Sequence, residues 1–238
     1  MKADIGIIGG TGIYDPTVFK GEDIEIKTPY GNVSVLVGDY EGKKIAILFR
    51  HGKDHVVPPH KINHKANIFA LKELGVKTII ATGAVGSLQD NLNPGDIVIV
   101  DQFIDFGKQV FTYFDDKVEH KSMAYPFDGD LRKKLIESAK TLGIKHHDKG
   151  TYIKIEGPQF STRAASRMYK QFGDVIGMTC VPEAILANEL GIKIAVVATV
   201  TDYDTFKEQS VSWDEIQKVM KENVEKTRLI LDGVIKKL

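Results

Sequence analysis

Short apolar runs alternate with amphipathic segments along the chain, which is typical of an α/β domain. Runs rich in Ile, Val and Ala predict buried strands. A strand covered on both faces carries apolar side chains on both, so its sequence is continuously apolar rather than alternating. Apolar residues three or four apart, closed by a glycine, predict helices. The predicted strands are residues 5–8, 24–27, 33–37, 44–49, 76–81, 97–104, 151–155, 174–178 and 192–200, and the predicted helices are residues 63–74, 131–142, 161–172, 182–190 and 213–235.

Residues 175–204 hold a strand, a helix and a second strand in direct succession. Met178 and Thr179 follow the first strand, and Asp202 and Asp204 follow the second. In open α/β sheets, ligands bind at the carboxyl ends of the strands. We therefore expect the chemistry of this protein to lie around these four side chains.

A glycine loop at residues 9–12 follows the first strand. Glycines let a backbone approach a ligand closely and point its amides at an anion. The dinucleotide fingerprint G-x-G-x-x-G needs glycine at 9, 11 and 14 or at 10, 12 and 15, and Thr11, Tyr14 and Asp15 break both registers. The loop favours a small anion such as phosphate, with a glycine turn that binds nothing as the alternative.

Two further features suit an anion. A second loop of small residues, 82–87, follows the strand at 76–81. Arg50 and His51 end the strand at 44–49, and arginine offers a planar fork to phosphate oxygens. Charged residues at a strand end are also commonly only solvated, so this pair alone does not identify a site.

Four histidines at positions 51, 55, 60 and 64 raise the question of a metal site. Pro58 and Pro59 interrupt the run, so the four cannot share one helix face. No cysteine joins them, and Asp54 is the only carboxylate between them. We predict no metal site.

Residues 105–125 show no clear period and carry several aromatic side chains, which suggests a binding loop or a subunit contact. Ser212 and Glu215 have the spacing of a capping box for the last helix. The three strands between residues 24 and 49 predict an antiparallel meander. Together the elements predict a single α/β domain over residues 1–238, with a twisted mixed sheet flanked by helices.

Composition narrows the function classes. Of the 238 residues, 42% are hydrophobic, which is enough for one full core. Lys+Arg and Asp+Glu both number 32 with no block of like charge, so neither nucleic acid nor a membrane surface is an expected partner. The single cysteine, Cys180, excludes an intrachain disulfide. With no signal peptide and no membrane-spanning run, we expect a cytoplasmic protein.

Five motifs in order along the chain carry a resemblance to a known family: GGTG at 9–12, RHG at 50–52, EGPQFS at 156–161, MTCVPE at 178–183 and TDYD at 201–204. With them the chain resembles the trimeric purine nucleoside phosphorylases, most closely the 5′-methylthioadenosine phosphorylase branch. The resemblance implies phosphate-dependent cleavage of a purine nucleoside into free base and a ribose 1-phosphate. It also implies no cofactor and no metal, inorganic phosphate as co-substrate, and a homotrimer or a dimer of trimers.

The resemblance also implies a role for each matching residue. The catalytic residues would be Asp202 and His51. Phosphate would be held by Thr11, Arg50, His51 and Thr179, with loop amides around Gly9 and Ala84. Met178 would back the ribose, and His120, Trp213 and Ile216 would border the 5′-substituent. The base would be held by Phe160, Ser161, Asp202 and Asp204.

Ser161 and Asp202 favour adenine, because the 6-oxopurine branch has a glutamate and an asparagine at these places. A carboxylate accepts a hydrogen bond from a 6-amino group but meets a 6-oxo group lone pair to lone pair. Gly83 and Gly177 depart from the methylthioadenosine branch, which has a phosphate-binding threonine and an asparagine there. The segment after Asp204 is also shorter than in the animal enzymes.

Three readings of the function follow. The first is a 5′-methylthioadenosine phosphorylase of purine and methionine salvage. The second is a 6-oxopurine phosphorylase acting on inosine, guanosine or methylthioinosine. The third, from a different class, is a nucleoside-binding protein without catalysis, against which the intact set Thr11, Arg50, His51 and Asp202 argues.

Overall fold

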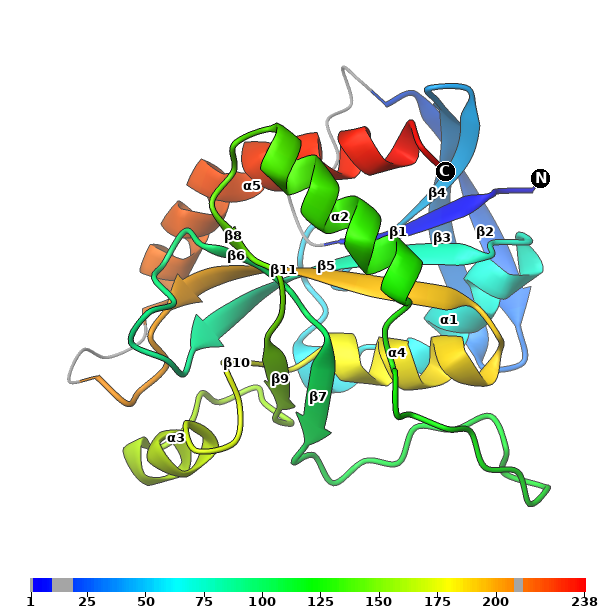
Figure 1. The fold of residues 1–238 in the computed structure, drawn as a ribbon. Coiled ribbons are helices and arrows are strands. Elements are labelled where there is room, and N and C mark those ends of the chain that lie inside the picture. Colours follow the sequence, from blue (N-terminus) through cyan, green and yellow to red (C-terminus); the bar gives the residue numbers. More distant parts are fainter. Residues whose placement is uncertain (1, 10–18, 208–211) are drawn as a thin grey trace.

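Eleven strands form one mixed sheet in the computed structural model, which describes residues 2–9, 19–207 and 212–238 (Figure 1). The main order is β2-β3-β4-β1-β5-β10-β9-β7, while β11 pairs with β5 and leads outward to β6 and β8. The strands are β1 (Ile5–Gly9), β2 (Gly21–Thr28), β3 (Gly31–Tyr40), β4 (Lys43–Phe49), β5 (Thr78–Ser87), β6 (Ile97–Ile99), β7 (Gln102–Asp105), β8 (His146–His147), β9 (Thr151–Lys154), β10 (Val175–Gly177) and β11 (Lys193–Asp202). The helices are η1 (Pro59–Lys61), α1 (His64–Glu73), α2 (Gly129–Thr141), α3 (Arg163–Tyr169), α4 (Cys180–Glu189) and α5 (Trp213–Ile235).

Helices cover both faces of the sheet. In Figure 1, α2 and α5 lie across one face, and α1 and α4 lie across the other. Alternate side chains of β1 enter the two apolar clusters: Ile5 and Ile7 pack with residues of α2 and α5, and Ile8 packs with residues of α1 and α4. Burial on both faces explains why the central strands read as continuous apolar runs. The predicted α/β fold with a mixed sheet is confirmed.

No helix in the described part of the chain is both long and apolar enough to cross a membrane.

The predicted meander is confirmed, because β3 pairs antiparallel with both β2 and β4. Two other predictions were wrong. Residues 82–87 are not a loop but the second half of β5, since they pair with β11 through Gly86 and with β10 at Gly86 and Ser87. Residues 97–104 are not one strand, because β6 pairs with β11 and β7 pairs with β9.

Helix ends also differ from the prediction. At the start of α1, Asn63 caps the helix by accepting a hydrogen bond from the Ala66 amide. Helix α3 is shorter than residues 161–172, and its cap is Thr162. The capping box predicted for α5 is only partly correct. Ser212 is the N-cap residue and has an extended backbone, but its side chain forms no capping hydrogen bond in the described structure.

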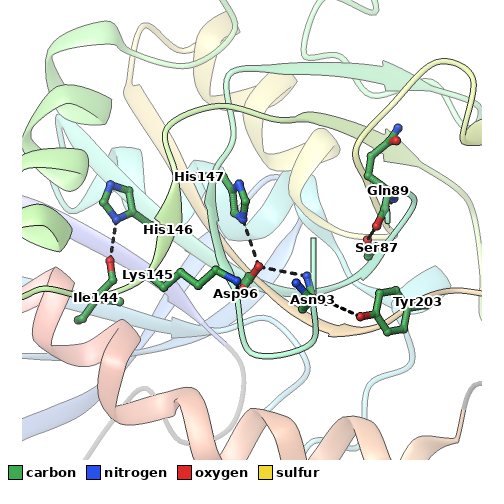
Figure 2. Close-up of polar contacts among 9 residues, drawn as sticks. All are labelled: Ser87, Gln89, Asn93, Asp96, Ile144, Lys145, His146, His147 and Tyr203. Carbon is green, nitrogen blue, oxygen red and sulfur yellow. Dashed lines mark hydrogen bonds and ion pairs between the residues drawn. The ribbon is translucent and has the colours of Figure 1, made fainter. Parts of the chain in front are cut away.

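A polar cluster outside the sheet core holds the turn that follows β11 (Figure 2). The buried Asp96 accepts hydrogen bonds from Lys145 at 2.8 Å, from His147 at 3.1 Å and from the Asn93 amide at 3.1 Å. Tyr203 donates to Asn93 Oδ1 at 2.6 Å. Burial alone would raise the pKa of Asp96, but these hydrogen bonds lower it, so the carboxylate stays charged. Because Tyr203 directly follows β11, the cluster fixes the residues at the end of that strand.

His64 makes the free energy of unfolding depend on pH. It is buried in the first turn of α1, edge-on to Phe111, and its Nδ1 has no hydrogen-bond partner within the described structure. Burial lowers its pKa to about 3, with a further contribution from Arg50 and Lys154. The unfolded chain therefore takes up a proton first, near pH 6.5, and the free energy of unfolding should fall by about 1.4 kcal/mol per pH unit between about pH 6.5 and pH 3.

Denaturant titrations of wild type and His64→Leu at pH 7 and pH 5 test this prediction. The leucine fills the same buried site without a titrating group. Its loss of stability on acidification should be smaller than that of wild type by about 2 kcal/mol. Equal losses in the two proteins would show that His64 is not the titrating group.

Candidate active site

A cavity of about 460 Å³ opens where β5 meets β10 and β11. On one side of β5, β1 pairs only as far as Ala81, and β10 pairs only from Gly86. In the described part of the chain, residues 82–85 therefore have no strand partner on that side. The residues that line the cavity are Arg50, His51, His55, Val56, Val57, Pro58, Pro59, Thr82, Gly83, Ala84, Val85, Gly86, Ile155, Pro158, Phe160, Ile176, Gly177, Met178, Thr179, Thr199, Thr201, Asp202, Asp204, Trp213, Ile216, Met220, Val224 and Thr227.

The ends of β10 and β11 meet at this cavity for a reason that the sequence did not reveal. β10 runs antiparallel to β5, whereas β11 runs parallel to it, so the unit is not a parallel crossover. Ile176 and Asp202 both lie opposite Gly86, on either side of β5. The side chains after the two strands therefore come together by flanking one short stretch of β5.

Arg50 lines the cavity and is almost fully buried. Its Nε and Nη2 donate to the two carboxylate oxygens of Glu183 at 2.6 and 2.8 Å. Its Nη1 donates to the Thr82 carbonyl at 2.5 Å. The cation is thus held in one orientation by α4 and β5, and it still lines the cavity.

His51 is a neutral ring in this setting. Its Nδ1 lies 2.8 Å from the Val57 carbonyl, which can only accept, so Nδ1 carries the proton and Nε2 is an acceptor. The pKa of His51 is lowered to about 4, mainly by burial and also by the Arg50 charge, although the Val57 hydrogen bond opposes this. The His51 ring stacks on His55 with 4.5 Å between ring centroids, and the His55 ring lies 5.7 Å from that of Trp213.

Asp202 and Asp204 form the polar edge of the cavity. The two oxygens of Asp202 accept from Thr201 Oγ1 at 2.8 Å and from the Asp204 amide at 2.7 Å. Burial raises the pKa of Asp202, and the charges of Asp204 and Glu215 add to this, against the lowering effect of the two hydrogen bonds. Asp204 is buried with φ of 48°, and its Oδ2 has no hydrogen-bond partner within the described structure. Such an edge can exchange a proton and accept hydrogen bonds.

Other parts of the lining are apolar. Phe160 and Trp213, which are 42% and 48% exposed, line the cavity, and so does the buried Ile216, one turn after Trp213 in α5. Met178 also faces the cavity. An aromatic and aliphatic wall of this kind binds a flat base or an apolar substituent.

Ten of the thirteen residues that the sequence singled out line the cavity: Arg50, His51, Ala84, Phe160, Met178, Thr179, Asp202, Asp204, Trp213 and Ile216. Thr11 lies outside the described residues. His120 is exposed and Ser161 Oγ is buried without a hydrogen-bond partner in the described structure, and neither is among the lining residues.

Sequence reasoning gave no role to Glu183 or Tyr152. Glu183 stands inside the MTCVPE motif, and an acidic residue in the otherwise apolar start of a helix is a signal that could have drawn attention to it. Tyr152 is fully buried beneath the start of α4, where it accepts hydrogen bonds from the Thr179 and Cys180 amides. Burial raises the pKa of its hydroxyl, so it stays protonated.

Packing explains the two glycines that departed from the expected pattern. A Cβ at Gly177 would overlap the Tyr152 hydroxyl. A Cβ at Gly83 would lie 3.0 Å from Cys180 Sγ, closer than such atoms normally approach. Gly177 is thus required by the buried Tyr152, and a side chain at Gly83 would need Cys180 to shift by a few tenths of an ångström.

The described residues hold no group of three or more His, Cys, Asp or Glu side chains that could bind a metal ion. Of the four histidines of the sequence pattern, His51 and His55 stack on each other, and the His64 ring packs against Phe111.

Comparisons with known proteins agree with this geometry. The profile of the Phosphorylase superfamily matches residues 4–236. The S-methyl-5′-thioadenosine phosphorylase of Pyrococcus abyssi is 54% identical, over 98% of this chain and 92% of its own length. A probable 6-oxopurine nucleoside phosphorylase of Dictyoglomus turgidum is 50% identical, over 98% and 91%. The solved methylthioadenosine phosphorylase of Schistosoma mansoni in complex with adenine has a TM-score of 0.92 at 36% identity, covering 98% of this chain and 90% of that one.

Proposed function

This chain belongs to the phosphorylase superfamily, and on that premise we propose that it is a pentosyltransferase that cleaves 5′-methylthioadenosine with inorganic phosphate. The products are adenine and 5-methylthioribose 1-phosphate, and the reaction serves purine and methionine salvage. The observation that carries the proposal is the pairing, across one cavity, of the buried Arg50 cation with the Asp202 carboxyl of raised pKa.

At the phosphate end, Arg50 supplies a fixed cation, and Thr179 and the backbone around Ala84 supply donors. Thr11 belongs to the same set by its motif. The neutral His51 accepts through Nε2, so it suits the remaining hydroxyl of hydrogen phosphate or a ribose hydroxyl. A phosphate held here stabilises the ribosyl cation that forms as the base departs, and then captures it at C1′.

At the base end, the leaving purine needs a proton or a hydrogen bond on its imidazole ring. Asp202 supplies it, because burial keeps a fraction of this carboxyl protonated above the usual range. The second oxygen of Asp202 accepts from the 6-amino group, together with Asp204 Oδ2, which is buried without a partner in the described structure. Phe160 stacks on the ring. Ser161 is assigned to the base by its motif alone, because it does not line the cavity in the described structure.

The sugar end is apolar. Met178 backs the ribose, and Trp213 and Ile216 suit a methylthio group better than a hydroxyl. No cofactor or metal takes part in the proposed reaction. We place the enzyme in the cytoplasm.

We also propose a homotrimer or a dimer of trimers. Phe106, Val110, Val118 and Tyr125 are all exposed on the irregular segment 105–125, next to the exposed Ile104 of β7, and such a concentration of exposed apolar side chains suits a subunit contact. His120 lies on the same segment. In such an assembly His120 borders the 5′-substituent in the cavity of a neighbouring subunit.

The second candidate is a 6-oxopurine phosphorylase, which the Dictyoglomus turgidum relative and Gly177 favour. The Tyr152 hydroxyl accounts for Gly177 without reference to the base, which weakens this argument. The third candidate is a nucleoside-binding protein without catalysis. Binding alone would need neither the buried Arg50 nor an Asp202 of raised pKa, so these two features argue against it.

Release of free base from 5′-methylthioadenosine, adenosine, inosine and guanosine, each with and without phosphate, tests the proposal. We expect adenine to be released fastest from 5′-methylthioadenosine and only in the presence of phosphate. Faster release from inosine or guanosine would establish the 6-oxopurine reading. Saturable binding with no release from any nucleoside would establish the binding protein.

A further inference from the structure

We infer that Glu183 is a positioning residue of the phosphate site, acting through Arg50. This inference rests on the proposed function. Both carboxylate oxygens of Glu183 accept from the Arg50 guanidinium, at 2.6 and 2.8 Å, and the two side chains are 1% and 2% exposed. A paired, two-point contact of this kind fixes the plane and the rotation of a guanidinium.

The contact determines which donors Arg50 can offer. A guanidinium has five N–H groups, and Glu183 and the Thr82 carbonyl together take three of them. Two remain for an anion in the cavity. Arg50 therefore approaches phosphate with one face and in one orientation, rather than as a mobile cation.

Glu183 also joins separate parts of the site. It lies in the first turn of α4, whose N-cap residue is Thr179. Arg50 directly follows β4, and Thr82 lies in β5. The ion pair spans 133 positions of the chain and sets the place of Arg50 relative to Thr179, two of the side chains proposed to hold phosphate.

The negative charge has an electrostatic role as well. Arg50 is buried, and a buried cation without a partner is strongly destabilising. Glu183 removes that destabilisation while the cavity is empty. The site is thus built before phosphate arrives, and no donor has to reorient during the reaction.

Steady-state kinetics of Glu183→Gln and Glu183→Asp test the inference. The amide keeps the shape but turns an N–H group toward the guanidinium, and aspartate keeps the charge but withdraws it by one carbon. Because a displacement of about 1 Å can cost about 100-fold in rate, we expect kcat/KM for phosphate to fall by about 10- to 100-fold in both variants. The Kd of adenine, measured by calorimetry without phosphate, should stay within about twofold, which is about 0.4 kcal/mol.

Glu73→Gln is the control. Glu73 is an exposed carboxylate in the last turn of α1 and does not line the cavity. This variant should keep wild-type kinetics for phosphate.

Other outcomes are distinguishable. If Glu183→Gln does not fold, Glu183→Asp, which retains the buried pair of charges, decides the question. An unchanged kcat/KM for phosphate in a folded Glu183 variant would overturn the inference, as would an equal weakening of adenine binding, which indicates a general structural role. Failure of the proposed function would appear differently, as absence of phosphorolysis in wild type.

Discussion

Asp202→Asn is expected to lower kcat/KM for phosphorolysis of 5′-methylthioadenosine by about 10²- to 10⁴-fold, the usual contribution of a positioned acid. The amide cannot give up a proton to the leaving purine. It can still accept from the Asp204 amide, and its NH₂ can donate to Thr201 Oγ1, so the turn should keep its shape. The loss should be much smaller with inosine, because an amide N–H donates to a 6-oxo group. The measurement is kcat/KM for both nucleosides at saturating phosphate.

The decisive quantity is the ratio of kcat/KM for 5′-methylthioadenosine to kcat/KM for inosine. Asp214→Asn is the matched control, since Asp214 is an exposed carboxylate in the first turn of α5 that does not line the cavity. Its preference should equal that of wild type. An unchanged preference in Asp202→Asn would remove the basis for assigning adenine as the base.

Arg50→Met is expected to lower the free energy of unfolding by about 3–5 kcal/mol, because it leaves the buried Glu183 carboxylate without its partner. Arg50→Met combined with Glu183→Met should recover most of this loss, since paired apolar side chains of similar volume replace a buried ion pair at little cost. Denaturant titrations of wild type, the single variant and the double variant measure the two values.

Neither Arg50→Met nor the double variant should release base at a measurable rate, because both lack the cation that is proposed to bind phosphate. Stability and activity are thereby separated in the double variant. A double variant as unstable as Arg50→Met would show that the unpaired Glu183 carboxylate is not the cause of the lost stability. Phosphorolysis by a folded double variant would exclude Arg50 from the phosphate site.

The sequence predicted most elements because their signals are local. The Asn63 cap and Gly75 delimit α1, and the apolar runs of β1 and β11 report burial on both faces. Residues 82–87 were misread because small residues after a strand are typical of a loop, while their strand structure depends on pairing with β11 and β10, far along the chain.

The site was predictable to the extent that its residues fall in contiguous motifs. Arg50, Thr179 and Asp202 come from three motifs and line one cavity. The Arg50–Glu183 pair was not predictable, since the partners are 133 positions apart and nothing local links them. The reason for Gly177 was not predictable either. The sequence pointed to a difference in base specificity, whereas the structure shows that the Tyr152 hydroxyl leaves no room for a side chain there.

The most direct test of the central claim is to identify the sugar product. Wild-type protein is mixed with 5′-methylthioadenosine and phosphate, and the mixture is followed by phosphorus NMR together with adenine absorbance. We predict a new phosphate-ester resonance in a one-to-one ratio with adenine. Adenine that appears with free methylthioribose, at a rate independent of phosphate, would contradict the account.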